Sequence, residues 1–470
     1  MTNVANVVID SGEVTADLTD FVLLVDLSDM PTGFWSSVVD GGGDIRVFKS
    51  DGTTELAREI VSCDTGTDTG EIWIKFSGVL SSSSDTTIQI HTDGTSSEPG
   101  TTDTYGRNNV WSDYVAVLHL EDSNYTDSTG NGNSGTGTSV TQVTGQVGGG
   151  ASLPGSNNNK VEISDDASLD FAGDFHLSAW LKANSPTSDS RSQRYGPSQG
   201  WLFPWIDDSP NKYRMVVWGG STAADVTGTS TPTTNWTHLH GIKNASSVAI
   251  AVNGTVEATK TVTLGSVSSN AAYRIGVNAF GDQETDGIFD EVRIAGFAAS
   301  SSWISTEYNN QSSPSTFYTA SAPAGGGTAI TANNGSVLAT GQQASLAQPI
   351  ELQATPGSVL ATGQQASLVQ PIELQATPGS VLATGQQGTL TLGNAVTIVA
   401  TPGQVAANSQ QGNFATALFL VANNGHLVAE SQQGAVGIGT GPAPKDRTFI
   451  VEADARLFVV EADARLFVVN

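Results

Sequence analysis

The sequence is short of several common features, and each shortage narrows the range of functions. It contains one cysteine, Cys63, so no disulfide can form within the chain. Lys and Arg together number 19 against 46 Asp and Glu, which gives a formal net charge of −27. A chain this acidic is not a general nucleic-acid binder and is a poor ligand for anionic membranes, because both need a basic face.

Targeting and membrane-spanning segments are also missing from the sequence. There is no apolar run of about 18 residues, so we expect no transmembrane helix and no membrane insertion. The first residues lack the basic start and apolar centre of a signal peptide. We therefore expect the chain to be made in a cytoplasm without a standard export signal.

What is present indicates an all-β protein of about three domains. The 470 residues include 52 glycines and many Ser and Thr, and long helix-forming runs are absent. Apolar and polar residues alternate in 44–49, 71–76 and 86–91, as in half-buried strands. We predict a small β-sandwich over 1–108 and a larger jelly roll over 109–320.

Residues 111–318 resemble bacterial laminin-G-like, concanavalin A-like lectin domains. The resemblance rests on an ordered set of segments, no one of which is specific alone: AVLHLED at 116–122, DSTGNGN at 127–133, FHLSAWLK at 175–182, NWTHL at 235–239, VNG at 252–254, GIFDEVRI at 287–294 and WISTEY at 303–308. The segment before it resembles, more weakly, a domain of unknown function that often precedes such lectin-like domains.

The C-terminal third is repetitive. After a flexible linker at 321–328, five units of about 22 residues fill 329–440. Their glycines stand at 335, 357, 379, 403 and 425, which gives spacings of 22, 22, 24 and 22. Each unit is predicted to form two short strands that need neighbouring units or other chains to bury a core. The alternative is a disordered low-complexity spacer.

The final segment, 441–470, contains the nonapeptide EADARLFVV twice, at 452–460 and 461–469. Strand-forming residues at a chain end favour a docking tail that adds strands to another subunit, and a self-contained hairpin is the alternative. The predicted anchoring residues are Arg456, Leu457, Phe458, Arg465, Leu466 and Phe467. This tail and the repeats resemble segments of structural proteins of tailed bacteriophages.

The resemblance to lectin-like domains implies a calcium site at Asp127, Asn131 and Asp290, which match positions that coordinate Ca²⁺ in related domains. Asp286 and Glu291 are candidates to assist, because hard cations take several oxygen ligands. The alternative is structural: Asp127 and Asn131 shape a turn, and Asp290 caps the end of a strand.

A glycan-binding face is predicted near the loop 195–205. Tyr195, Trp201, Trp205 and Trp218 are aromatic residues on which sugar rings stack, and Asp207 and Asp208 are nearby hydrogen-bond acceptors. The alternative, that most of these aromatic residues pack in the core, is the commoner situation for such residues.

Enzymatic chemistry finds little support in the sequence. The Glu-x-Asp-x-Glu strand motif of the jelly-roll glucanases that this fold resembles is absent. His238 and His240 would share one strand face, but no cysteine or third histidine lies near them in the sequence, so a structural role is favoured over zinc binding. Cys63 has no obvious base partner and reads as a small buried hydrophobe.

Together these features predict a non-enzymatic virion surface protein of a tailed bacteriophage, either a capsid-attached fibre or decoration or a tail fibre. Its expected partners are other virion subunits, copies of itself, most simply as a trimer, and cell-surface glycans. Two alternatives stay open: a secreted or surface-bound bacterial adhesin, and a polysaccharide-degrading enzyme with an unrecognised pair of carboxylates.

Overall fold

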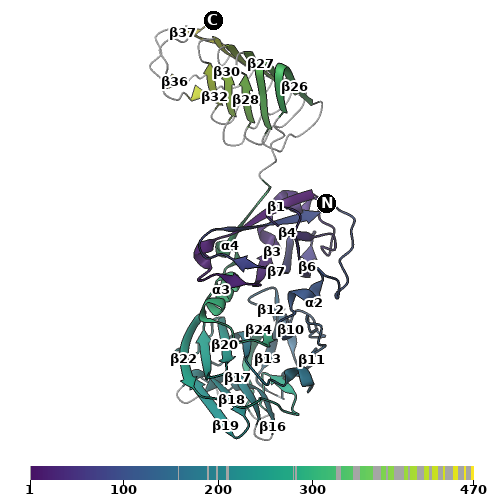
Figure 1. The fold of residues 1–470 in the computed structure, drawn as a ribbon, viewed down its shortest axis with the longest axis vertical. Coiled ribbons are helices and arrows are strands. Elements are labelled where there is room, and N and C mark those ends of the chain that lie inside the picture. Colours follow the sequence, from purple (N-terminus) through teal and green to yellow (C-terminus); the bar gives the residue numbers. More distant parts are fainter. Residues whose placement is uncertain are drawn as a thin grey trace. The chain divides into compact units, whose positions relative to one another are not determined.

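The computed structural model describes residues 2–323 except for 157, 188–189, 197–198, 208–210, 279 and 281–282, together with the backbone of strands between 330 and 469. The chain forms two compact units, Met1–Ala322 and Pro323–Asn470 (Figure 1). Strands dominate both, so the all-β prediction is confirmed. Among the described residues, no helix combines the length and apolar character needed to cross a bilayer.

The sandwich segment comprises residues 2–106. Its strands are β1 (Thr2–Ile9), β2 (Leu18–Thr19), β3 (Val22–Asp26), β4 (Arg46–Lys49), β5 (Glu55–Leu56), β6 (Arg58–Asp64), β7 (Thr69–Lys75), β8 (Val79–Leu80) and β9 (Thr86–Thr92), with the short helix α1 (Thr32–Trp35). One sheet has the order β1-β9-β4-β5 and the other β3-β7-β6. Alternation along β9 buries Ile88 and Ile90 in the core between the sheets, as the sequence predicts.

A strand from far along the chain completes this sandwich. β25 (Tyr318–Ser321) pairs antiparallel with β1, with Asn6 opposite Ser321 and Ile9 opposite Tyr318. The preceding helix α4 (Pro314–Phe317) places Phe317 in the sandwich core beside Tyr318. The sandwich therefore uses residues beyond 317, which a division at 108 and 320 does not anticipate, and the segment between is an insertion in it.

The inserted residues 107–313 form the jelly-roll segment. It contains α2 (Arg107–Val110), α3 (Ser301–Ser312) and fifteen strands: β10 (Tyr114–Leu118), β11 (Gly135–Thr138), β12 (Thr141–Thr144), β13 (Gly149–Pro154), β14 (Lys160–Ile163), β15 (Phe175–Ala183), β16 (Ser190–Gly196), β17 (Gln199–Asp207), β18 (Lys212–Gly219), β19 (Thr222–Thr227), β20 (Thr237–Lys243), β21 (Ser247–Val252), β22 (Thr255–Thr261), β23 (Tyr273–Ile275) and β24 (Asp286–Ala295).

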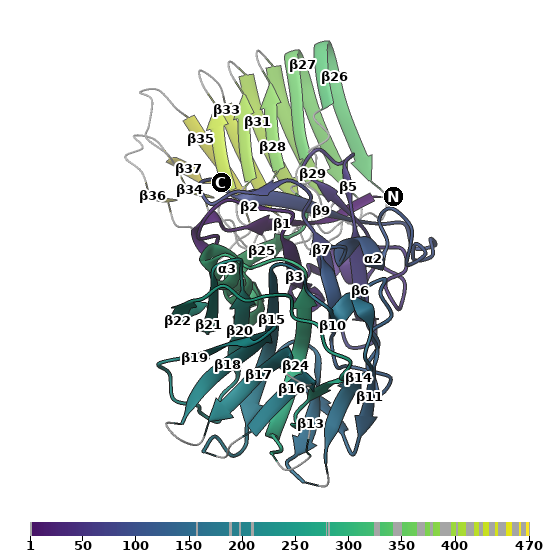
Figure 2. The ribbon, with the colours of Figure 1, turned by 60° about the horizontal axis from the view of Figure 1, so that its bottom comes forward.

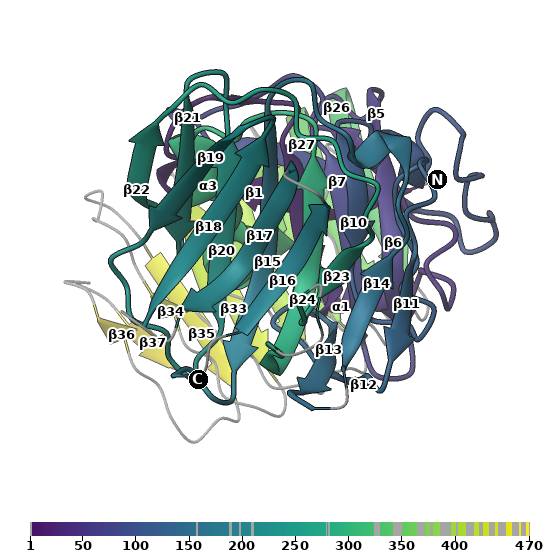
Figure 3. The same ribbon diagram turned by 90° about the horizontal axis from the view of Figure 1, so that it is seen from below.

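These strands form two antiparallel sheets packed face to face. The eight-stranded sheet runs β12-β13-β24-β15-β20-β21-β22, with β10 also paired to β24, and the seven-stranded sheet runs β11-β14-β23-β16-β17-β18-β19. Figure 3 views the unit from the side of the seven-stranded sheet. The main apolar core lies between the sheets and includes Leu177, Phe203, Met215 and Phe289.

The sandwich segment and α3 cover the other face of the eight-stranded sheet (Figures 1 and 2). The side chain of Ser300 caps α3 by accepting a hydrogen bond from the N–H of Trp303. Asn310 on α3 pairs with the backbone of Leu24 on β3 in both directions, at 2.7 and 2.9 Å. These bonds hold the sandwich and jelly-roll segments together across a buried interface.

In the second unit the described strands are parallel and in register. They are β26 (Ile330–Gly341), β27 (Ile350–Gly363), β28 (Ile372–Ala376), β29 (Gly379–Gly385), β30 (Val396–Ala400), β31 (Gly403–Ser409), β32 (Leu418–Ala422), β33 (His426–Ser431), β34 (Ile438–Gly439), β35 (Thr448–Ala453), β36 (Val460–Glu461) and β37 (Phe467–Val469). Val359 lies opposite Val381, and Val381 opposite Val405. Successive repeats therefore stack on one another, and equivalent positions form columns.

Candidate functional site

The outer face of the seven-stranded sheet carries an aromatic cluster. Along β18, Tyr213, Met215 and Val217 point into the core, so Arg214, Val216 and Trp218 point outward. The rings of Trp218 and Tyr195, from β18 and β16, lie with their centroids 4.7 Å apart, and both side chains are half-buried. The pair is accessible enough to present a ring face to a ligand.

Trp205 joins this cluster, although it is largely buried. It packs with Leu202 and Val216, and the guanidinium of Arg214 lies 3.9 Å from the centre of its ring. Arg214 also forms ion pairs with Asp207 and Asp225. Asp207 is therefore engaged by Arg214, while Asp208 lies outside the described residues.

Trp201 is not part of the cluster, so its assignment to a glycan-binding face is wrong. Its side chain is fully buried in the main core, 5.8 Å from the ring of Tyr273 and 5.7 Å from that of Phe175. A core position leaves no ring face for a sugar. The structural alternative holds for this residue.

The residues of the predicted calcium site are engaged in turns and strand ends. Asp127 accepts hydrogen bonds from the backbone N–H groups of Val117, Thr129 and Asn133 and from the hydroxyl of Thr129. The amide of Asn131 donates to the carbonyl of Val115. This geometry matches the structural alternative, in which both residues shape the turn after β10.

Asp290 and Asp286, both on β24, also have protein partners. One carboxylate oxygen of Asp290 accepts from the N–H groups of Gln146 and Val147, both at 2.8 Å. Asp286 accepts from the amide of Asn184 at 2.9 Å. Neither belongs to the clusters of three or more potential ligands that the described residues form, and calcium binding stays a prediction.

Comparison with known proteins bears on this segment. Residues 154–305 match the family model described as the concanavalin A-like lectin/glucanases superfamily. Within the jelly-roll segment, residues 154–305 therefore form a domain of the concanavalin A-like lectin/glucanases type. We refer to the jelly-roll segment below as the lectin-like domain. No curated protein matches the chain.

Solved structures with a similar fold are distant. The binding domain of Paraclostridial Mosquitocidal Protein 1 is 16% identical with a TM-score of 0.38, over 42% of this chain and 52% of that one. Domain 4 of AbnA, a GH43 extracellular arabinanase from Geobacillus stearothermophilus, solved with arabinotriose, is 22% identical with a TM-score of 0.34, over 42% and 98%. The botulinum neurotoxin serotype D ligand binding domain, solved with N-acetylneuraminic acid, is 14% identical with a TM-score of 0.36, over 42% and 51%. This chain thus spans about half the length of the first of these.

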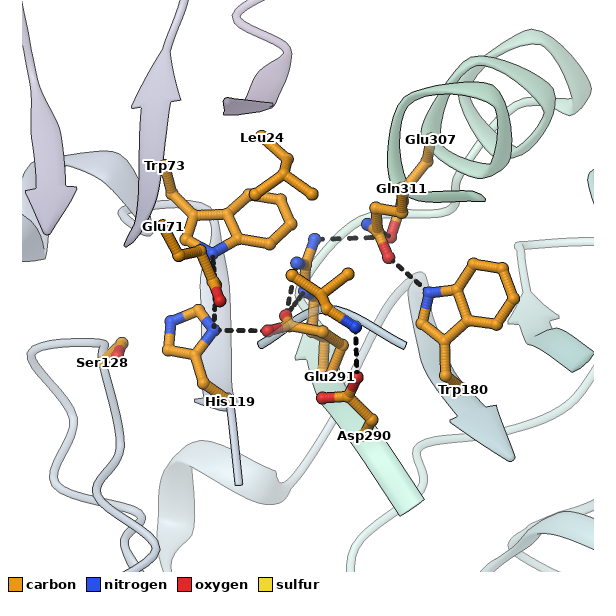
Figure 4. Close-up of polar contacts among 12 residues, drawn as sticks. Leu24, Glu71, Trp73, His119, Ser128, Trp180, Asp290, Glu291, Glu307 and Gln311 are labelled. Carbon is orange, nitrogen blue, oxygen red and sulfur yellow. Dashed lines mark hydrogen bonds and ion pairs between the residues drawn. The ribbon is translucent and has the colours of Figure 1, made fainter. Parts of the chain in front are cut away.

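A second group of polar residues lies between the lectin-like domain and the sandwich segment (Figure 4). His119 follows β10, and each of its ring nitrogens is hydrogen-bonded to a carboxylate. Nδ1 lies 2.7 Å from Glu291, and Nε2 lies 3.2 Å from Glu59. The indole N–H groups of Trp73 and Trp111 donate to Glu71 and Glu59, respectively. Glu71 also lies 3.8 Å from Nδ1, so three carboxylates converge on one imidazole at the interface.

Arg293 on β24 links this group to α3. Its guanidinium binds Glu291 at 2.5 Å and Glu307 at 3.4 Å. It also lies over the rings of Trp73 and Trp111, at 4.1 and 4.9 Å. Because Trp73 belongs to the sandwich segment, one buried cation contacts both parts of the unit.

The electrostatics of this interface follow from burial and from these pairs. Burial and the neighbouring Glu291 raise the pKa of Glu71 well above its usual value, which favours its uncharged form. For His119, burial works against the charged form, but Glu291 and Glu59 outweigh it and raise the pKa well above its usual value. His119 is therefore a cation held between carboxylates.

The interface carboxylates are too deeply buried to act on a polysaccharide. Glu59, Glu71 and Glu291 are between 1 and 5% exposed. A glycosidase needs two carboxylates that flank a bound sugar, and no sugar reaches these. They serve the interface between the segments.

A further cluster lies on the same face of the eight-stranded sheet, and only two of its members, His238 and His240, could be paired from the sequence. β15 brings His176 beside His238 and His240 on β20, so a third histidine does lie near that pair. Polar and apolar residues alternate in both 176–180 and 238–242, but only the pairing of the two strands shows that their histidines lie together.

Most of the predicted anchoring residues lie outside the described residues: Arg456, Leu457, Phe458, Arg465 and Leu466. Phe467 begins β37.

Proposed function

We propose that the lectin-like domain binds glycans through the outer face of its seven-stranded sheet, and that the chain does no catalysis. The observation that carries this is the half-buried pair Tyr195 and Trp218 on that face. The family match of residues 154–305 supports carbohydrate binding as the use of the fold. The absence of the Glu-x-Asp-x-Glu glucanase motif from the sequence supports binding without hydrolysis.

The chemistry of the cluster suits a sugar ring. The C–H face of a pyranose packs on an aromatic ring, and charged groups beside the ring select hydroxyl positions. Arg214 and Asp225, which pair with each other at the edge of the cluster, supply a donor and an acceptor. Trp205 lies beneath Arg214 and fixes its position.

A glycan array probed with the full chain tests this proposal. Trp218→Ala and Tyr195→Ala should each weaken binding to the preferred glycan by about tenfold, the equivalent of about 1.4 kcal/mol. Tyr105→Ala is the matched control, because Tyr105 is an exposed tyrosine of the sandwich segment and should bind as the wild type does. Wild-type affinity in both variants, or a wild-type chain that binds no glycan, would refute the proposal.

We further propose that the chain is a fibre or decoration protein on a tailed-phage virion, with the repeats as its stalk and residues 441–470 as its anchor. The in-register parallel stacking of β26 to β37 supports a stalk, since each added repeat lengthens the same columns. The resemblance of the repeat sequences to phage structural proteins supports the setting. Assembly as a homo-oligomer would cover the ends and edges of such sheets.

Cross-linking mass spectrometry on purified particles tests the setting independently of glycan binding. Cross-links from residues 441–470 to a capsid or tail subunit are expected. A chain found free in the supernatant and missing from particles would refute a virion role and favour a secreted adhesin.

A further inference from the structure

Three histidines and a glutamate meet in the buried layer between the eight-stranded sheet and α3. His176 lies on β15, His238 and His240 lie on β20, and Glu307 lies on α3. Ser178 is directly opposite His240 in the strand ladder, so His176 is diagonal to His240 on the same face. Potential ligand atoms of His176, His240 and Glu307 all lie within 4.8 Å of one another.

Several ring nitrogens in this cluster have no hydrogen-bond partner. They are Nε2 of His176, Nδ1 of His238 and both nitrogens of His240. All three side chains are at most 1% exposed. A buried polar atom without a partner costs about 1–3 kcal/mol, so four of them together need an occupant that satisfies them.

The hydrogen bonds that do exist prepare a ligand set. Nδ1 of His176 lies 2.9 Å from the carbonyl of Phe297, so it carries the proton and Nε2 keeps a free lone pair. Glu307 is fixed by Trp303 and Gln311, at 3.1 and 3.2 Å. An oriented imidazole and an oriented carboxylate are the usual environment of a bound transition metal.

The group around His119 at the interface differs from the cluster around His240. His119, Glu71 and Glu291 also lie close enough together to be counted as potential ligands. Both nitrogens of His119 already have carboxylate partners, at 2.7 and 3.2 Å. In the cluster around His240, by contrast, four ring nitrogens have no hydrogen-bond partner.

We propose that His176, His240 and Glu307 bind a Zn²⁺ ion that ties α3 to the eight-stranded sheet. Two imidazoles and one carboxylate are a typical zinc donor set. His238, whose Nε2 lies 3.8 Å from Glu307, is the available fourth donor. Trp180 stacks on His238 at 4.6 Å and Phe297 packs on His176 at 4.7 Å, and the three histidines are at most 1% exposed, so the site is closed to solvent, as structural sites are. The guanidinium of Arg293, 3.4 Å from Glu307, is a neighbouring cation that the carboxylate would share with the ion.

The site is closed once α3 has packed, so the ion must enter during folding. The decisive experiment therefore refolds the full, tag-free chain from denaturant after chelation, with Zn²⁺, with Co²⁺ or with no metal. We expect about one equivalent of zinc per chain by elemental mass spectrometry after gel filtration. Co²⁺ should give the visible absorption of a four-coordinate nitrogen and oxygen site, and Zn²⁺ should raise the unfolding temperature.

Variants locate the ion. His240→Gln and Glu307→Gln should each lose the zinc, whereas His91→Gln should retain it, because His91 lies on β9 of the sandwich segment. Less than about a tenth of an equivalent in the wild type refolded with excess zinc would overturn the proposal and leave a buried water as the occupant. Equal zinc in the wild type and both ligand variants would also overturn it. If a variant fails to fold, the Co²⁺ spectrum of the wild type still decides.

Discussion

Arg293 offers the sharpest test of how the sandwich segment and the lectin-like domain are joined. Its side chain is 1% exposed and lies between Glu291, Glu307 and the rings of Trp73 and Trp111. Arg293→Met retains most of the volume of the side chain but removes the charge and all the donors. Glu291 then keeps only His119 as a charged partner, and Glu307 loses its guanidinium.

The expected cost is large because removal of one partner leaves buried charge uncompensated. Breaking a buried ion pair in this way costs about 3–5 kcal/mol. The lost cation–π contacts with two tryptophans add to this, at about 0.5–2 kcal/mol each when desolvated. We therefore expect the free energy of unfolding to fall by at least about 3 kcal/mol.

Tryptophan fluorescence during urea unfolding is a suitable assay, since all nine tryptophans lie in the first compact unit. Arg274→Met is the matched control: Arg274 pairs with Glu162 at 2.7 Å, but both side chains are 31% exposed. A pair this exposed contributes about 0–1 kcal/mol. If the two variants lose the same small amount of stability, the reasoning about the buried interface is wrong.

Three further predictions concern other parts of the chain. In the folded state Glu291 and Glu59 raise the pKa of His119 despite its burial. The charged histidine therefore stabilises the fold fully below about pH 6.5, and this stabilisation is lost as the pH rises through the pKa of the folded state. Urea unfolding should show a free energy of unfolding that falls at alkaline pH, and His119→Gln should reduce this dependence on pH. Gly200→Ala places a Cβ against the carbonyl oxygen of Arg194 at a φ of +131°, so it should lower the melting temperature markedly. Gly173→Ala, with open space around it, should not. Equivalent positions of the repeats pair at an offset of 22 residues. Deletion of residues 357–378, one full period, should therefore preserve the far-ultraviolet circular dichroism per residue of the second unit, whereas deletion of half a period should reduce it.

Local alternation was enough to predict the strands but not what covers them. The run 71–76 was predicted as a half-buried strand, and β7 forms there. Its polar side includes Glu71, which is buried because the lectin-like domain packs against that face. A sequence shows that two faces of a strand differ in polarity, but whether the polar face meets water depends on contacts between residues far apart in the chain.

The aromatic cluster shows a second limit. Trp201 and Trp205 are four residues apart, so a regular strand would point both to the same side. A bulge between Leu202 and Trp205 shifts the register of β17 against β18, which sends Trp201 into the core and Trp205 outward. Pro204 lies within this bulge and is the local sequence signal for it, because proline inside a strand is confined to edges and bulges. It does not say which of the two tryptophans faces the core.

The insertion of the lectin-like domain into the sandwich has a mechanical consequence. A pulling force applied to the chain at Pro323 acts on β25 first, before any residue of the lectin-like domain. The ladder to β1 and the hydroxyl of Tyr318, which accepts from the N–H of Asp26 and donates to Asp29, resist that load. A pull on the C-terminal end of this unit would thus load the edge of the sandwich first and leave the outer face of the seven-stranded sheet unloaded.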